Sequence, residues 1–265
     1  MASPHPSKST PRKATSQKSP RNSLSVPTST ALIVLLAART VAALSVPISD
    51  CDEVFNYWDP MHLLTHGKAL QTWEYHPRFA LRSWAYVALH SIVPFFTLIF
   101  TSSSVFAFYA LRVTLAALCA CVEHHLYSTL ATHPGYSATS IPKYYLLFSV
   151  FSTGLFISSP AFLPSSFAMM TTTMAVSCAL RISHNRRRIY ATLVFMAIGT
   201  VWGWPFVGVL VLPYALHELA TASSGFVLRK RLQFAFEAIG LVVLFVVVCT
   251  CLAKSPWVAS FGFTA

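Results

Sequence analysis

The sequence predicts an all-α membrane protein with many spanning helices. Of its 265 residues, 55% are hydrophobic and only 10% are charged, and the mean hydropathy is +0.58. A chain of this composition carries too much apolar surface for one soluble core. Its net charge of +11 comes from short basic blocks between apolar runs, a pattern that orients membrane proteins. These observations argue against a soluble enzyme and against a nucleic-acid-binding protein.

Residues 1–29 differ from the rest of the chain. They are rich in Ser, Thr and Pro, hold five Lys or Arg residues and contain no Asp or Glu. Such a segment cannot bury enough apolar surface to fold, so we expect a disordered basic cytosolic tail. A mitochondrial transit peptide shares these features, but it forms an amphipathic helix, and residues 1–29 have almost no large apolar residues for one.

The first predicted span is the apolar run from Ala31 to Val46, interrupted only by Arg39 and Thr40. With its flanks it approaches the ~20 residues that a span needs. It is too long and too internal for the core of a cleaved signal peptide, so we predict an uncleaved signal-anchor. Basic residues precede it and acidic residues follow it, which places the N-terminus in the cytosol. We therefore expect a multi-span membrane domain over residues 30–265, with a first lumenal loop at 47–83.

Further apolar runs predict more membrane helices. They are Trp84–Phe100, Val105–Leu126, Tyr144–Ile157, Phe162–Leu180, Ile189–Leu216, with a possible break at WGWP (202–205), and Phe234–Leu252. The basic blocks at 181–188 and 229–231 should both be cytosolic, but five full crossings would place the first of them in the lumen. We therefore predict that Trp84–Leu126 makes one net crossing, because Pro94 and the polar TSSS at 101–104 can turn a half-span back.

Two charged residues lie within the predicted span Val105–Leu126. Arg112 is near the start of a helix and Glu123 is near an end. We expect both side chains to snorkel toward the membrane surface.

Acidic residues gather directly after the first span. Five of the eight, Asp50, Asp52, Glu53, Asp59 and Glu74, fall within residues 50–74. A carboxylate there can act as a general base, bind a divalent metal or simply line a wet loop. The D-x-D formed by positions 50 and 52 is only a weak metal signal, because such pairs arise by chance in acidic loops.

No other metal motif accompanies the acids. His124 and His125 are adjacent, so on a helix they point in different directions. The six cysteines show no C-x-x-C spacing. We therefore predict neither a metal nor a disulfide framework.

Aromatic residues surround the acids. They are Phe55, Tyr57, Trp58, Trp73, Tyr75 and Trp84. Aromatic faces at this depth either form the belt of a membrane interface or stack on sugar rings, and the composition leaves both readings open.

The same segment resembles a known family. DCDEVFNYW (50–58), QTWEYHP (71–77) and RSWAY (82–86) are similar to the first lumenal loop of the eukaryotic dolichyl-phosphate-mannose-dependent alpha-1,2-mannosyltransferases, which extend the lipid-linked oligosaccharide precursor of N-glycans. SSPAFLPSSFAM (158–169) and GWPF (203–206) extend the resemblance through most of residues 46–210. The combination is far more specific than any single acidic pair.

The resemblance implies a fold and a site. It implies a GT-C-like multi-span glycosyltransferase of the endoplasmic reticulum membrane, with a dolichol-linked sugar donor, a lipid-linked oligosaccharide acceptor and no cofactor. In related enzymes the acid of an H-x-D-E-like motif is the base, which here falls on Asp52 and, with less support, on Glu53. Position 50 is Asp instead of His, which fits the alpha-1,2 subgroup. The expected substrate-binding residues are Asp50, Trp58, Trp73, Glu74, Tyr75, Arg78 and Arg82.

The implied reaction needs one base. Converting a beta-linked mannosyl phosphate into an alpha-mannoside inverts the anomeric centre, so one carboxylate removes the acceptor proton during a single displacement. Dolichyl phosphate leaves as an anion, so neither an acid nor a metal is required. Arg78 or Arg82 can supply a cation for the phosphate, although an interfacial arginine can equally neutralise lipid headgroups, and Glu74 can pair with either.

Three functional classes remain in view. Members of the family continue beyond the region matching Phe234–Leu252, so the resemblance implies that this chain corresponds to an N-terminal portion. A catalytically silent membrane partner is therefore the main rival to an active transferase. A transporter is the third, supported by Arg112 and the break near Gly203, but it would place its acids within the spans.

Overall fold

The computed structural model describes residues 26–70, 72–76, 78–79, 81–181 and 186–220, with single positions at 229, 230, 232, 233, 236, 237 and 240. The predicted tail up to residue 25 and most of the predicted span 234–252 lie outside the described residues. Within them every regular element is a helix, which confirms the all-α class.

The elements follow one another in a simple order. They are α1 (Thr28–Ser45), α2 (Cys51–Glu53), the π-helix η1 (Val54–Trp58), α3 (Asp59–His66), the 3-10 turn η2 (Trp73–Tyr75), α4 (Trp84–Phe100), α5 (Ser104–Thr132), α6 (Ile141–Phe151), α7 (Thr153–Ser158), α8 (Pro164–Ala179), α9 (Arg186–Ile198), the π-helix η3 (Gly199–Gly203), the 3-10 helix η4 (Pro205–Leu210) and α10 (Val211–Ala220). Among the described residues, α1 and α5 are long and apolar enough to cross a membrane on their own.

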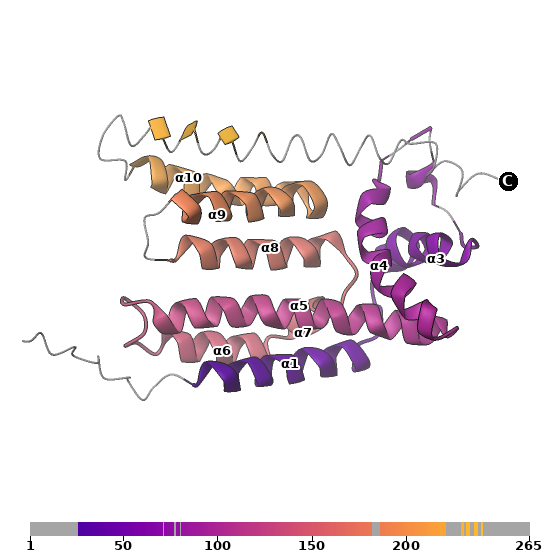
Figure 1. The fold of residues 1–265 in the computed structure, drawn as a ribbon, viewed down its shortest axis with the longest axis horizontal. Coiled ribbons are helices and arrows are strands. Elements are labelled where there is room, and N and C mark those ends of the chain that lie inside the picture. Colours follow the sequence, from indigo (N-terminus) through magenta and orange to yellow (C-terminus); the bar gives the residue numbers. More distant parts are fainter. Residues whose placement is uncertain are drawn as a thin grey trace, which may run out of the picture.

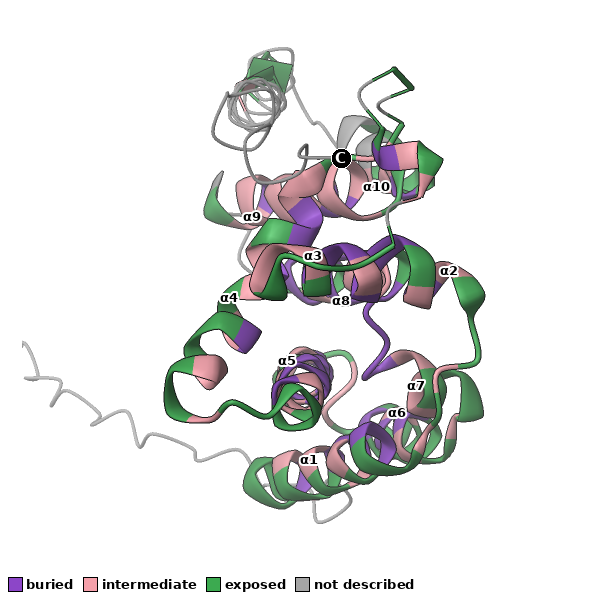
Figure 2. Cartoon of the chain, turned by 90° about the vertical axis from the view of Figure 1, so that its right-hand side faces the viewer, coloured by how far each residue is buried: buried purple, intermediate pink, exposed green. Residues whose placement is uncertain are grey.

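The long helices form a bundle, and α2, α3 and α4 cover one of its ends (Figure 1). From one side to the other, Figure 1 shows α1 with α6 and α7, then α5, α8, and α9 with α10. α5, seen nearly end-on in Figure 2, is buried at many positions because it packs against α1, α4, α6 and α8. It is the central helix of the bundle.

α4 explains why the apolar runs before residue 181 outnumber the passes that the chain makes along the bundle. It begins at Trp84, capped by the Ser83 hydroxyl, which accepts from the amide of Ala85 at 3.2 Å. It contains Pro94 and runs across the end of the bundle instead of along it (Figures 1 and 2). α4 and α5 therefore lead the chain along the bundle once, as the charge pattern predicts.

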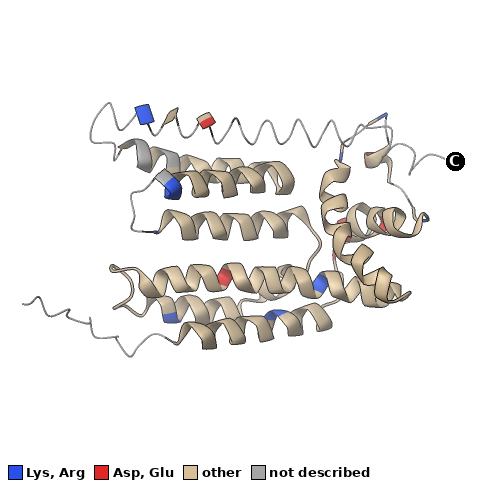
Figure 3. Ribbon diagram, in the orientation of Figure 1, with Lys and Arg blue, Asp and Glu red and all other residues tan. Residues whose placement is uncertain are grey.

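Contacts at the two bundle ends show which segments meet there. At one end, His124 contacts the carbonyl of Thr28 at 3.0 Å, and Arg181 contacts the ring of His125 at 2.9 Å. This end therefore holds the start of α1 and the basic residues after α8. At the other end lie α2, η1 and α3, with the acidic residues (Figure 3).

Two predicted helices are interrupted. The run 144–157 bends at Ser152, whose backbone is extended and whose hydroxyl caps α7, so it forms α6 and α7. The run 189–216 breaks at Trp204, as expected from WGWP. Just before this break, an added Cβ at Gly203 would lie 2.9 Å from Cβ of Ala168, so glycine permits the close approach of η3 to α8.

A buried ion pair joins three helices. Arg39 of α1 donates from Nε and Nη2 to the two carboxylate oxygens of Glu123 at 3.0 and 2.8 Å, and Nη2 also donates to the carbonyl of Ser149 at 2.7 Å. Arg39 is 0% and Glu123 4% exposed. The snorkelling prediction for Glu123 is therefore wrong: lipid cannot solvate its charge, and the neighbouring helix supplies a counter-charge.

Arg112 is also turned inward, contrary to the snorkelling prediction. Its Nε and Nη2 donate to the carbonyls of Ala43 and Val46 at 3.1 and 2.6 Å. These are among the last carbonyls of α1, which have no partner within the helix. Arg112 therefore fixes the end of α1 against α5.

The first prediction from the fold concerns topology. Leu70→Asn creates an N-x-T sequon with Thr72 in the segment near the acids, and Ser137→Asn creates one with Thr139 between α5 and α6. We expect glycosylation of the Leu70 variant and none of the Ser137 variant when the chain inserts into endoplasmic reticulum membranes, measured by a glycosidase-sensitive gel shift. Both variants should also carry flexible spacers, so that distance from the bilayer does not limit modification. The reverse pattern would refute the topology.

The second prediction concerns the ion pair. Glu123→Gln leaves the buried guanidinium of Arg39 without its counter-charge, so we expect a loss of about 3–5 kcal/mol in the free energy of unfolding. The double variant Arg39→Met with Glu123→Met should recover much of that loss. Lys143→Met, at an exposed position of α6, is the control and should change little. Denaturation in detergent micelles measures all of them, and equal stability of Glu123→Gln and wild type would contradict the assignment.

Candidate active site

The acidic segment folds as one helical stretch. The Asp50 carboxylate accepts from the amide of Asp52 at 2.9 Å and so caps α2. α2 continues without interruption into η1 and α3, which ends at Gly67 in a left-handed conformation with φ of 73°. The π-turn of η1 widens the helix just after Asp52, and such turns are frequent at functional sites.

Asp52 is a half-buried carboxylate of this stretch with one oxygen left unbonded by the described residues. Its side chain is 40% exposed, and Oδ1 accepts from Nη2 of Arg82 at 2.8 Å and from Nδ2 of Asn56. Oδ2 accepts no hydrogen bond from any residue that the structure describes. One oxygen is therefore held in place, and the other is open to take a proton.

Arg82 connects two carboxylates. Besides Asp52, it donates from Nε to Glu74 and from Nη1 to the hydroxyl of Tyr57, and its guanidinium carbon lies 5.3 Å from the centre of the Tyr57 ring. Partial burial works to lower the pKa of Arg82, but the hydrogen bond to Glu74 and the charges of its partners outweigh burial and raise it. Arg82 therefore stays charged and orients the acids around it.

Tyr57 also stays protonated, because burial raises its pKa to about 12. The phenol is thus a neutral partner for the guanidinium of Arg82.

Glu53 is buried and is assigned to the framework instead of to catalysis. It is 4% exposed, and Oε1 accepts from the indole N–H of Trp58 and from the amide of Phe162, both at 2.9 Å. These bonds fasten the acidic helix to the loop between α7 and α8, within SSPAFLPSS. The sequence left the base open between Asp52 and Glu53, and the geometry favours Asp52 because an acceptor hydroxyl cannot reach an interior carboxylate.

The aromatic residues around the acids divide into buried and exposed rings. Trp58 is 8% exposed and packs against Phe108 and Phe162 at centroid distances of 4.5 and 5.3 Å. Tyr75 is 3% exposed and donates from its hydroxyl to the carbonyl of Asn56 at 2.7 Å. Both rings pack in the core, and Trp58 also borders a cavity of about 230 Å³ between α3, α4 and α5. A substrate contact for either ring stays a prediction. Trp73, at 59%, remains available.

The other predicted substrate-binding residues differ in their exposure and in their hydrogen-bond partners. Arg78 is exposed, beside the ring of Phe79 at 6.0 Å, and has no ion pair among the described residues. Arg82 and Glu74 are paired with each other. Asp50 is exposed, but its carboxylate caps α2. Arg78 is therefore the more accessible of the two predicted phosphate-binding cations.

Metal binding has little support from the acids. Within the described part of the chain, no group of three or more His, Cys, Asp or Glu side chains is arranged to hold a metal ion. The D-x-D pair is not a chelate here, because Asp50 accepts from the amide of Asp52 while Asp52 is bonded to Arg82.

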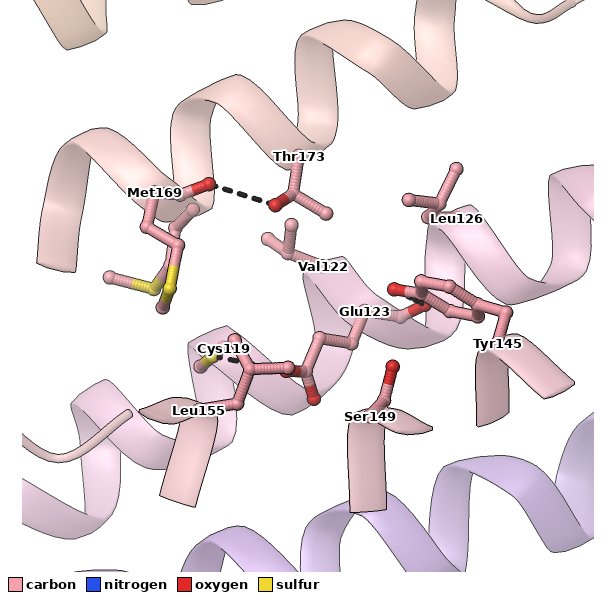
Figure 4. A pocket seen from close by; sticks show the side chains of 10 residues that line it. Cys119, Val122, Glu123, Leu126, Tyr145, Ser149, Leu155, Met169 and Thr173 are labelled. Atoms are coloured by element: carbon pink, nitrogen blue, oxygen red, sulfur yellow. Dashed lines mark hydrogen bonds between the residues drawn. The ribbon is translucent and has the colours of Figure 1, made fainter. Parts of the chain in front are cut away.

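A second polar region lies deeper in the bundle. A cavity of about 120 Å³ between α5, α6, α7 and α8 is bordered by Glu123, Ser149 and Cys119 together with apolar side chains (Figure 4). The Glu123 carboxylate there is already paired with Arg39. This region is far along α5 from the helices that carry Asp52, so we treat it as part of the bundle interior.

Sequence reasoning missed Asn56 and Phe162. Asn56 follows Asp52 by four residues, which is one helical turn, so helical spacing alone could have indicated their contact. Phe162 is separated from Glu53 by 109 residues, and no local pattern predicts that bond.

Together, the bundle and the solvent-facing carboxylate at its end define a helical membrane protein with a polar site at one membrane surface. The sequence profile of the Alg9-like mannosyltransferase family matches residues 30–254, and the chain belongs to this family of multi-span membrane glycosyltransferases. The recognition of a mannosyltransferase from DCDEVFNYW and its companion motifs is thereby confirmed.

Comparison with individual proteins supports the same family assignment. The alpha-1,2-mannosyltransferase alg9 of Schizosaccharomyces pombe is 38% identical over 232 residues, which cover 88% of this chain and 39% of that protein. The alpha-1,2-mannosyltransferases ALG9 of Mus musculus and Homo sapiens are 39% and 41% identical, covering 82% and 72% of this chain and 34% and 30% of those proteins. The chain thus spans about a third of the length of these relatives. No solved structure matches it.

The difference in burial between Trp58 and Trp73 generates a prediction. Trp58→Ala should lower the free energy of unfolding by about 3–5 kcal/mol, because it empties a packed site in the core. Trp73→Ala should leave stability almost unchanged, because its ring is exposed, and any effect should fall on substrate affinity. Thermal or denaturant unfolding of both variants tests this, and a larger loss for Trp73→Ala would reverse the assignment.

Proposed function

We propose that the chain carries the catalytic face of an inverting alpha-1,2-mannosyltransferase. Its donor is dolichyl-phosphate-mannose and its acceptor is the lipid-linked oligosaccharide of N-glycan precursor assembly. The relatives are named as alpha-1,2-mannosyltransferases, which supports the transfer of mannose, and the proposal extends this activity to the chain. We further propose an endoplasmic reticulum location with a cytosolic N-terminus, because basic residues precede α1 and lie beside the end of α8.

The observation that carries the proposal is the state of Asp52. Its side chain is 40% exposed, Arg82 and Asn56 both donate to Oδ1, and no described residue donates to Oδ2. A general base needs a fixed lone pair facing the acceptor, with its own orientation determined by neighbours. The buried Glu53 does not meet that requirement, and the carboxylate of Glu74 is occupied by Arg82.

The reaction balances with one base. The acceptor hydroxyl oxygen attacks the anomeric carbon, the bond from that carbon to the phosphate oxygen breaks, and the electron pair leaves with dolichyl phosphate. Oδ2 of Asp52 takes the hydroxyl proton as the new bond forms. The leaving phosphate gains negative charge, and the exposed Arg78 is suited to stabilise it.

The position of Asp52 along the bundle suits a lipid-borne donor. Arg112 fixes the end of α1, and Asp52 follows that end by only a few residues. The base therefore lies close to the height at which a sugar on a membrane-anchored phosphate would sit.

A chimera tests the proposal. The whole chain replaces the matched N-terminal part of the fission yeast relative, and transfer of mannose from dolichyl-phosphate-mannose is measured in membranes. We expect activity, and we expect Asp52→Asn to reduce it by ~10²-fold or more, the usual contribution of a positioned base. Asp59→Asn, at the half-buried start of α3, is the matched control and should have a much smaller effect.

Other outcomes have distinct meanings. If Asp52→Asn retains transfer and Glu53→Gln abolishes it, the base is Glu53. If both retain it, the acidic segment is only a solvated loop at the membrane surface, and the proposed mechanism is wrong. A chimera that inserts stably but transfers nothing would favour a silent membrane partner, and the chain should be assayed alone in parallel. Recovery of the chain with mitochondria would contradict the proposed location.

A further inference from the structure

We propose that Asn56 is a positioning residue for this reaction, holding Oδ1 of Asp52 so that Oδ2 alone faces the acceptor. The inference rests on the proposed function, since it concerns the same base. It assigns a role to a residue that carries no charge and that is buried, so it does not contact the substrate itself.

Asn56 is buried, at 8% exposure, and three of its polar groups have partners in or beside the site. Its Nδ2 donates to Oδ1 of Asp52, and its Oδ1 accepts from the hydroxyl of Thr72 at 2.9 Å. Its backbone carbonyl accepts from the hydroxyl of Tyr75 at 2.7 Å. Asn56 therefore lies between the base and the segment 72–75.

The orientation of the amide follows from its partners. An ionised carboxylate can only accept hydrogen bonds, so the amide nitrogen must face Asp52. The amide oxygen then faces Thr72, whose hydroxyl can donate to it. Thr72 thereby holds the amide in the orientation that the carboxylate selects.

Because both donors bind Oδ1, the two carboxylate oxygens have different roles: Oδ1 is held in place and Oδ2 accepts the proton. Arg82 and Asn56 approach the same oxygen from different elements, so the plane of the carboxylate is fixed by two contacts and not one. A proton arriving from the acceptor then goes to Oδ2, and both hydrogen bonds on Oδ1 persist. The arrangement keeps the base oriented through the proton transfer.

Asn56 also joins the base to a surface that a substrate can touch. The segment 72–75 that it holds carries the exposed ring of Trp73 and the Glu74 partner of Arg82. A shift of this segment would therefore reach Asp52 by two routes, through Asn56 and through Arg82. This double connection distinguishes the residue from a side chain that merely satisfies a helix end.

The experiment uses the chimera and four variants. Asn56→Ala removes the donor, Asn56→Asp keeps the shape but places a second carboxylate against Asp52, and Thr72→Val frees the amide to rotate. Thr65→Val is the matched control, a half-buried threonine of α3 whose hydroxyl donates to the carbonyl of Met61. Rates are measured against donor concentration, with thermal unfolding of each purified variant.

We expect Asn56→Ala to lower kcat by about 10- to 100-fold, the scale of a misplaced reacting group. KM for the donor should change by less than about threefold, because Asn56 does not touch it. Asn56→Asp should lower kcat at least as far, because its carboxylate would repel that of Asp52. Thr72→Val should lower kcat by less than Asn56→Ala, and Thr65→Val should leave it unchanged.

Failures of the two proposals are distinguishable. If Asp52→Asn is inactive while the Asn56 and Thr72 variants change only stability or KM and leave kcat unchanged, the positioning role is wrong. If Asp52→Asn is fully active, the base itself is misassigned. If Asn56→Ala does not fold, the isosteric Asn56→Asp and the remote Thr72→Val decide by the same readout.

Discussion

The arrangement of the candidate site depends on the guanidinium of Arg82. Two carboxylates, Asp52 and Glu74, lie within its reach, and without a cation between them their like charges would drive them apart. A guanidinium can serve both because its planar fork offers separate N–H groups in fixed directions, which a lysine ammonium cannot reproduce. The phenol of Tyr57 completes the cluster from the core side. The most polar part of the chain is thus organised around one cation that is only partly exposed.

Charge inside the bundle is used differently. Arg39 and Arg112 point inward, where lipid offers no solvation, and each is matched by an acceptor on a neighbouring helix. The pair of Arg39 with Glu123 sets how α1 lies against α5, and Arg112 determines where α1 ends. Because Asp50 and Asp52 follow directly from that end, packing within the bundle determines the level at which the acids emerge. Structure and site are therefore joined through α1.

The sequence predicted the fold better than it predicted the site. The bounds of α4 and the break at Trp204 followed from apolar runs and from proline and glycine, because these are local properties. Asp52 and its cations were found because charge stands out in so apolar a chain. The bonds of Glu53 to Phe162 and of Glu123 to Arg39 could not be predicted, since each joins segments far apart along the chain. Composition alone also could not distinguish the buried ring of Trp58 from the exposed ring of Trp73, because that difference depends on packing.

The bond between Glu53 and Phe162 has a consequence for assembly. Glu53 belongs to the first helical segment after α1, yet its backbone partner is 109 residues further along the chain. During synthesis, α4, α5, α6 and α7 must therefore be made before this carboxylate can accept from the amide of Phe162. Until then the indole of Trp58 is its one partner among the bonds described, and burial of the charge is less favourable. The site is complete only when the loop before α8 arrives, which makes its maturation a late event in the insertion of the bundle.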